Sequence, residues 1–191
     1  MSEPLHLRPL GYLYKRIAGR PAWLEATDVV DVYSLSSCIS EPFADYIPFW
    51  KHNGFWLFDS PAIIRELAAE HGLALDGLRL FYYEAHEREY DEVRRTWLPY
   101  APEASFRTAI APPRGPVLEG FDVTSFTAGT APECSPLSCN AAARGIATNA
   151  HCLFATAAEA VHALERGGFA DAEPGPYRVI AVHSVDDPGA E

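Results

Sequence analysis

The stretch NGFWLFDSPAIIRELAAEHGLA, residues 53–74, is similar to a second stretch that lies 96 positions later. That second stretch is NAHCLFATAAEAVHALERGGFA, residues 149–170. Six identical residues share this spacing, and in the first copy they are Asn53, Leu57, Phe58, Ala62, Gly72 and Ala74. Each copy has the pattern of a turn, a short apolar strand and an amphipathic helix. Because a repeat at fixed spacing bears on the whole fold, the rest of the chain is interpreted around this pair.

Both copies carry sequence signals for the start of a helix. Ser60 precedes Pro61, the order of an N-cap residue followed by proline at the first helical position. Thr156 and Glu159 have the spacing of a capping box. Gly72 is placed to end the first helix in the left-handed conformation. We therefore predict one helix that begins at Pro61 and a second that begins just after Thr156.

A second match, at a spacing of 91 positions, pairs residues 31–34 with residues 122–125. Each half of the chain then has the order strand, loop, short strand, helix, strand. One helix cannot cover both faces of so many strands, so we expect the halves to share a sheet. We predict one α+β domain over residues 1–191, with a mixed sheet and an internal duplication. The halves cover about residues 28–98 and 119–186, and the proline-rich segment 99–118 joins them. An α/β layer fold is the alternative.

Composition excludes several classes of partner. The net charge is −11 and the isoelectric point is near 5.0, whereas nucleic-acid and anionic-membrane binders need Lys and Arg to neutralise phosphates. No run of about 18 apolar residues is present to span a bilayer. The N-terminal residues lack the apolar run of a signal peptide. We therefore expect a cytoplasmic protein with reduced cysteines, whose partner is a small molecule or another protein.

The two halves differ most at a cysteine-containing loop in the second half. Ser135-Pro136 repeats the helix-start pattern, which predicts a short helix over residues 137–144 with Cys134 just before it and Cys139 in its first turns. The first interpretation is packing, because free cysteine behaves as a small hydrophobe and these positions form a hydrophobic staple. The second is reactivity, because the positive end of a helix dipole lowers the pKa of a nearby thiol.

A reactive cysteine needs a base within hydrogen-bonding distance. His151 is the candidate base in this region, and Asn140, Asn149 and Glu133 are candidates to orient it. A cysteine, a histidine and an asparagine together have the chemistry required for acyl transfer. The candidate catalytic residues are therefore Cys134, Cys139 and His151.

The same region holds four residues of the types that bind zinc, which are Cys134, Cys139, His151 and Cys152. Their spacing differs from the paired cysteines of common zinc modules. If residues 151–154 form a strand, His151 and Cys152 point to opposite faces, so a further ligand such as Cys38 or His183 would be needed. On this basis we assign no metal site and no cofactor.

An aromatic segment around residues 49–56 is the other candidate site. Its ligand-binding candidates are Trp50, His52, Asn53 and Trp56, joined by Asn149 from the second copy. Aromatic rings beside a glycine turn can stack a flat ligand, although large aromatics more commonly fill the core. Asparagine favours left-handed turns, which explains Asn53 and Asn149 without any ligand.

Two functions follow from these patterns. The first is a binding domain for a small molecule or a protein. The second is a small thiol-dependent enzyme that uses a cysteine nucleophile and a histidine base. No phosphate-binding loop or other established catalytic motif is present to favour the enzyme.

Overall fold

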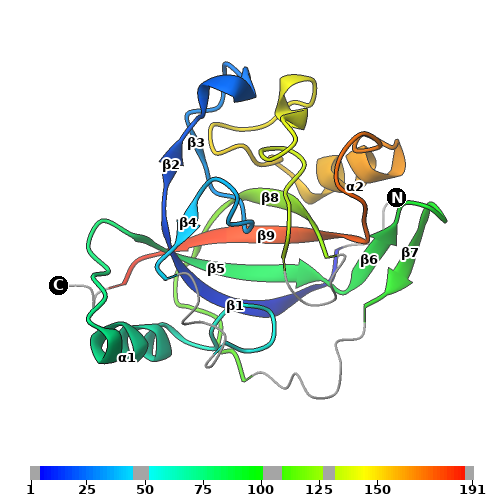
Figure 1. Cartoon of the computed structure of the whole chain (residues 1–191). Coiled ribbons are helices and arrows are strands. Elements are labelled where there is room, and N and C mark those ends of the chain that lie inside the picture. The colour runs from blue at the N-terminus through cyan, green and yellow to red at the C-terminus, as the bar shows by residue number, and fades with distance from the viewer. Residues whose placement is uncertain (1–4, 45–51, 101–108, 127–131, 188–191) are drawn as a thin grey trace.

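The computed structural model describes residues 5–44, 52–100, 109–126 and 132–187. Its main element is a seven-stranded sheet in the order β4-β1-β5-β9-β6-β7, with β8 also paired to β9 (Figure 1). These strands are β1 (Leu7–Arg16), β4 (Glu41–Pro42), β5 (Arg79–His86), β6 (Arg88–Asp91), β7 (Thr96–Pro99), β8 (Val117–Ser125) and β9 (Tyr177–Val185). A second, small sheet contains β2 (Ala18–Gly19) and β3 (Asp31–Val32).

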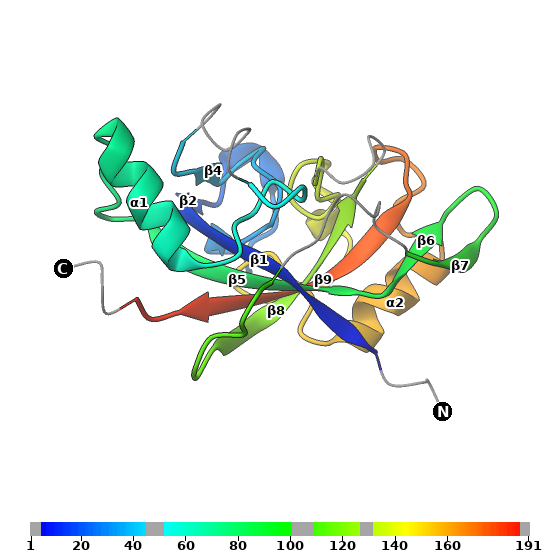
Figure 2. The same ribbon diagram turned by 90° about the horizontal axis from the view of Figure 1, so that it is seen from below.

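The helices lie at opposite ends of the main sheet (Figures 1 and 2). They are α1 (Pro61–His71) and α2 (Ala157–Glu165), and two short 3-10 helices are η1 (Ala22–Leu24) and η3 (Ala142–Arg144). Helix α1 buries Ile64 and Leu67, and helix α2 buries Ala160 and Leu164. The α+β prediction is confirmed. Among the described residues, no helix has the length and apolarity needed to cross a membrane.

The expected mixed sheet is wrong, because every described strand pair is antiparallel. The reason lies in the two long helical connections. Lys15 at the end of β1 pairs with Arg79 at the start of β5, and Ser125 at the end of β8 pairs with Tyr177 at the start of β9. Each connection therefore returns to the end of the sheet that it left, whereas a parallel pair needs a crossover to the opposite end.

The helix boundaries agree with the sequence signals. Ser60 caps α1 by accepting a hydrogen bond from the backbone N–H of Ile63, and Gly72 ends this helix with a left-handed φ of 66°. Thr156 and Glu159 form both hydrogen bonds of a capping box at the start of α2. Each signal lies within a few residues of the helix that it begins, which is why it can be recognised in the sequence.

A glycine with positive φ interrupts each of two strands. Gly11 in β1 has φ of 142°, and Gly120 in β8 has φ of 149°. A Cβ atom added at Gly11 would lie 2.7 Å from Cβ of Leu57, and one added at Gly120 would lie 2.7 Å from the carbonyl oxygen of Phe154. Glycine alone fits these positions, where the short segment before each helix crosses the strand.

Matching asparagines hold those crossing segments. The side-chain amide of Asn53 donates to the carbonyl oxygen of Leu10 at 2.9 Å, and that of Asn149 donates to the carbonyl oxygen of Glu119 at 2.7 Å. The backbone N–H of each asparagine donates to the carbonyl oxygen four residues later at 2.8 Å. By contrast, the segments matched at a spacing of 91 lie in different sheets, since β3 pairs with β2 and β8 pairs with β9.

Candidate functional site

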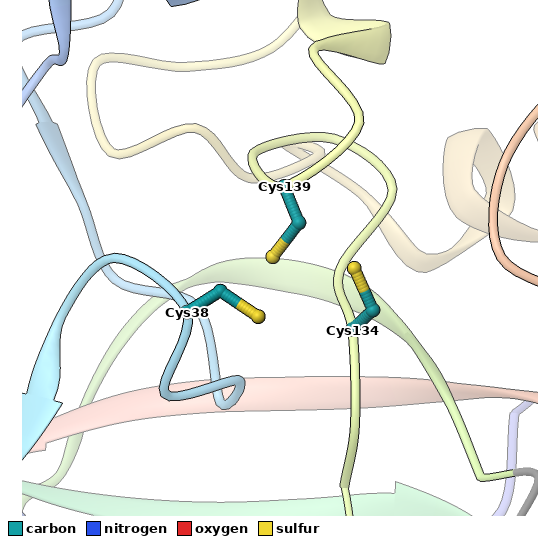
Figure 3. A group of neighbouring side chains, drawn as sticks. All are labelled: Cys38, Cys134 and Cys139. Atoms are coloured by element: carbon teal, nitrogen blue, oxygen red, sulfur yellow. The ribbon is translucent and has the colours of Figure 1, made fainter.

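Three cysteine sulfurs converge above the main sheet (Figure 3). The Sγ atoms of Cys38, Cys134 and Cys139 all lie within 4.8 Å of one another, and their side chains point toward a common centre. All three are free thiols, with Cys38 exposed, Cys139 partly buried and Cys134 buried. The site is formed by two segments, which we call the first arm (residues 34–38) and the second arm (residues 133–140).

The two arms contact each other directly beside the sulfurs. The Ser36 hydroxyl donates to the carbonyl oxygen of Glu133 at 2.9 Å, and the Cys38 thiol lies 3.6 Å from the same oxygen. The Ser36 hydroxyl also lies 3.5 Å from Sγ of Cys139. These contacts cross between residues about 100 positions apart, so the cluster is a tertiary feature of the fold.

The helix predicted over residues 137–144 is wrong. The second arm forms one turn, in which the N–H of Cys139 donates to the carbonyl oxygen of Ser135, and η3 follows. Ala141 between them has a left-handed φ of 56°, which prevents one continuous helix. The Ser135 hydroxyl donates to Asp122 instead of acting as a cap. A helix dipole therefore does not explain any change in thiol pKa at this site.

The thiols shift one another's pKa values. Hydrogen bonds from Cys134 and from Cys139 lower the pKa of Cys38. The pKa of Cys134 is raised, because its hydrogen bonds to Cys139 and Cys38 favour its protonated form and burial adds to them. The hydrogen bond from Cys134 lowers the pKa of Cys139, but the bond to Cys38 and burial leave it raised. Within this cluster, Cys38 is therefore the thiol whose pKa is shifted toward the thiolate form.

A buried lysine supports the first arm from below. Lys15 in β1 has no exposed surface, and its ammonium group donates to the carbonyl oxygens of Ser34 (2.5 Å), Leu35 (3.2 Å) and Ser36 (2.7 Å). Burial lowers the pKa of Lys15 to about 7, and the electrostatic influence of Asp122, Cys139 and Cys38 acts in the opposite direction.

A buried aspartate contacts both arms. Oδ2 of Asp122 in β8 accepts from the Ser34 hydroxyl at 2.8 Å and from the backbone N–H of Leu35 at 3.1 Å. Its Oδ1 accepts from the Ser135 hydroxyl at 2.6 Å. Burial raises the pKa of Asp122, although the hydrogen bonds from Ser135 and Ser34 oppose this shift.

The predicted base lies in a different group of side chains. Nδ1 of His151 is 2.6 Å from Asp31, its Nε2 is 3.7 Å from Glu119, and its ring stacks on Tyr33. The neighbouring Cys152 is buried in the core, and burial raises the pKa of this thiol to about 12. The structure thus brings Cys134 and Cys139 together with Cys38, and it pairs His151 with carboxylates.

The predicted aromatic site is mostly a set of local contacts. The His52 ring stacks on Trp56, and burial lowers the pKa of His52. The side-chain oxygens of Asn53 and Asn149 accept backbone hydrogen bonds within their own turns. Trp50 lies outside the described residues.

A groove of about 910 Å³ is formed by other residues. Helix α2 provides one wall with Val161 and His162, and His86 and Trp97 from the sheet provide another. The groove includes none of the three clustered cysteines. Its volume suits a small ligand, and its lining also includes charged side chains such as Glu159 and Glu165.

Sequence reasoning did not select Cys38, Lys15 or Asp122 as site residues. From the sequence, Cys38 is only a possible further metal ligand, together with His183. A signal was present in the strands, since Lys15 and Asp122 each interrupt an apolar stretch and buried charges need partners. Family models, curated proteins and solved structures were compared with this chain, and none of them matches it.

Proposed function

We propose that the protein binds one thiophilic metal ion through Cys38, Cys134 and Cys139, with zinc as the leading candidate. The observation that carries this proposal is the convergence of three sulfurs within 4.8 Å of one another. Zinc–sulfur bonds of about 2.3 Å in tetrahedral geometry place sulfur ligands roughly 3.8 Å apart. Small side-chain movements therefore suffice to form three bonds to one ion.

Metal binding accounts for this group better than packing does. A packing role suits buried cysteines, but Cys38 is exposed and still points toward the other two sulfurs. Thiolate ligands select soft or borderline ions such as zinc and copper(I). The Lys15 ammonium group beneath the first arm also reduces the repulsion between three thiolates.

The ligand count specifies the class of site. Structural zinc sites use four protein ligands, whereas sites with three protein ligands leave a position for water or substrate. Among the described residues, the three cysteines are the ligand group that converges. A zinc ion here would keep one position for an external ligand, consistent with a binding protein.

Cadmium titration of the reduced protein tests the proposal, because each thiolate–cadmium bond contributes to an ultraviolet charge-transfer band. We expect saturation at one ion per chain with the intensity of three thiolates. Replacing Cys38, Cys134 or Cys139 singly by Ser should lower the affinity by at least about tenfold. Cys152→Ala is the matched control, since Cys152 is a buried cysteine outside the cluster.

Retention of wild-type affinity in all three serine variants would contradict the proposal. Equal loss in the Cys152→Ala control would also contradict it, because the effect would then follow general destabilisation.

The alternative function is thiol-dependent catalysis, and Cys38 is its best nucleophile. Cys38 is exposed, and hydrogen bonds from Cys134 and Cys139 lower its pKa. A thiolate at neutral pH is the reactive form. In metal-free protein at about pH 6, iodoacetamide should then alkylate Cys38 before the other thiols. Slow, uniform labelling of all cysteines would remove this alternative.

We also infer that the chain arose by duplication. The bounds of the two halves differ from those predicted from the sequence. The first would run from β1 to β5 (residues 7–86) and the second from β8 to β9 (residues 117–185). The support is the shared order of strand, glycine bulge, asparagine turn, capped helix and strand. The paired strands β5 and β9 stand at the centre, between β1 and β8.

A further inference from the structure

Two charged side chains are fully buried beneath the cysteine cluster. Removing the Lys15 ammonium group and the Asp122 carboxylate from water is energetically unfavourable. A fold that needed only stability could place apolar side chains there. The Lys15 and Asp122 side chains both bind the arms that carry the cysteines, so their contribution is to hold these arms in place.

The Asp122 carboxylate divides its hydrogen bonds between the arms. One oxygen accepts from Ser34 and Leu35 of the first arm, and the other accepts from Ser135 of the second arm. Asp122 itself belongs to β8, which is paired with β9 along its length, so its position is fixed by the sheet. A single rigid group therefore sets the separation of the two arms.

The lysine completes the support of the first arm. Three successive carbonyl oxygens, those of residues 34, 35 and 36, converge on the Lys15 ammonium group. Three carbonyls that face inward in this way would repel one another without a donor between them. Cys38 follows two residues later, so this fixed turn determines where its sulfur lies.

We infer that Asp122 is the positioning residue of the three-cysteine site and holds both arms at the metal-binding separation before any ion arrives. The functional meaning of this inference rests on the proposed metal binding. Sites with ligands held in place by supporting hydrogen bonds bind more tightly than sites that must assemble. Loss of one supporting bond lowers the fraction of molecules that are ready to bind, and the apparent affinity falls by the same factor.

Substitutions of the two serines test the inference while leaving Asp122 and the cysteines in place. Ser34→Ala and Ser135→Ala each remove one hydrogen bond from one arm to Asp122. Each should weaken cadmium binding by about tenfold, the effect expected for one buried hydrogen bond to a charged group. The matched control is Ser40→Ala, because Ser40 is equally buried and its hydroxyl bonds to Val32 outside the arms.

A metal-free measurement separates this inference from the proposed function. Dibromobimane links two neighbouring thiols, and peptide mapping of the product separates links from Cys38 to the second arm from links between Cys134 and Cys139. The rate of the Cys38 cross-link therefore reports the distance between Cys38 and the second arm. Cross-linking should be fast in the wild type and in Ser40→Ala, and several-fold slower in Ser34→Ala and Ser135→Ala. If the wild type cross-links in this pattern but binds no cadmium, the proposed function fails and the positioning role stands.

The inference is overturned if both arm variants match the wild type in cross-linking rate and in cadmium affinity. It is equally overturned if Ser40→Ala loses as much as they do, because the loss would then follow general stability. A thermal melt of each variant confirms that the folded proteins are being compared.

Discussion

At the scale of single residues, Lys15 shows how burial and hydrogen bonding compete. Desolvation disfavours the ammonium form, and it lowers the pKa of Lys15 to about 7 from an ordinary value of 10.5. Three carbonyl acceptors and the Asp122 carboxylate act in the opposite direction. The residue thus remains charged at neutral pH only in part, and its titration is linked to folding.

This linkage predicts how stability changes with pH. Between the folded pKa of about 7 and the unfolded pKa of 10.5, the unfolded chain binds a proton that the folded chain lacks. Raising the pH through this window therefore favours the folded state. Chemical unfolding of the reduced, metal-free protein should show wild-type stability rising relative to Lys15→Met between about pH 7 and about pH 10. A constant or falling difference would contradict the assignment of Lys15.

At the scale of elements, the two glycine bulges fix where the crossing segments pass over the sheet. Gly11 and Gly120 combine a φ that side chains rarely adopt with neighbours closer than a Cβ atom permits. The cost of a side chain there comes from both backbone strain and a steric clash.

Alanine substitutions at these glycines should therefore be severe. Gly11→Ala and Gly120→Ala should each lower the free energy of unfolding by about 2 kcal/mol or more. Gly145→Ala is the control, because Gly145 has φ of −118° and no atom within 4 Å of an added Cβ. Its effect should stay within about 0.5 kcal/mol in the same denaturant titration. Equal effects at all three positions would refute this account of the bulges.

The elements also show which features can be predicted from sequence. The caps at Ser60 and Thr156 were predicted correctly, because each signal lies within a few residues of the helix it begins. The helix expected after Ser135 does not form as predicted. The Ser135 hydroxyl donates to Asp122 in strand β8 and does not cap a helix. Local patterns identify helices and turns, but a tertiary hydrogen bond can override them.

The candidate site was predicted only in part for the same reason. Cys134 and Cys139 are close in sequence and were selected together. Cys38 lies almost 100 residues earlier, and tertiary hydrogen bonds of Asp122 and Ser36 hold its arm beside theirs. His151 is near the second arm in sequence, yet its ring is paired with Asp31. Sequence proximity therefore identified two members of the cluster, whereas the structure groups His151 with carboxylates.

At the scale of the whole molecule, the antiparallel sheet serves as the platform for the arms. The segments that follow β3 and β8 lie together on one side of the sheet, where the backbone N–H of Val30 also donates to the carbonyl oxygen of Ala150 (Figure 1). A metal ion bound between the arms would link two segments that come from different halves of the chain. The proposed function requires that three sulfurs from these arms bind one ion.

X-ray absorption spectroscopy of the protein loaded with one equivalent of zinc tests this claim most directly, because it counts the atoms bound to the metal. The account predicts a first shell of three sulfur atoms at about 2.3 Å and one lighter atom from an external ligand. A shell of nitrogen and oxygen atoms alone, or one that is unchanged in Cys38→Ser, would contradict it.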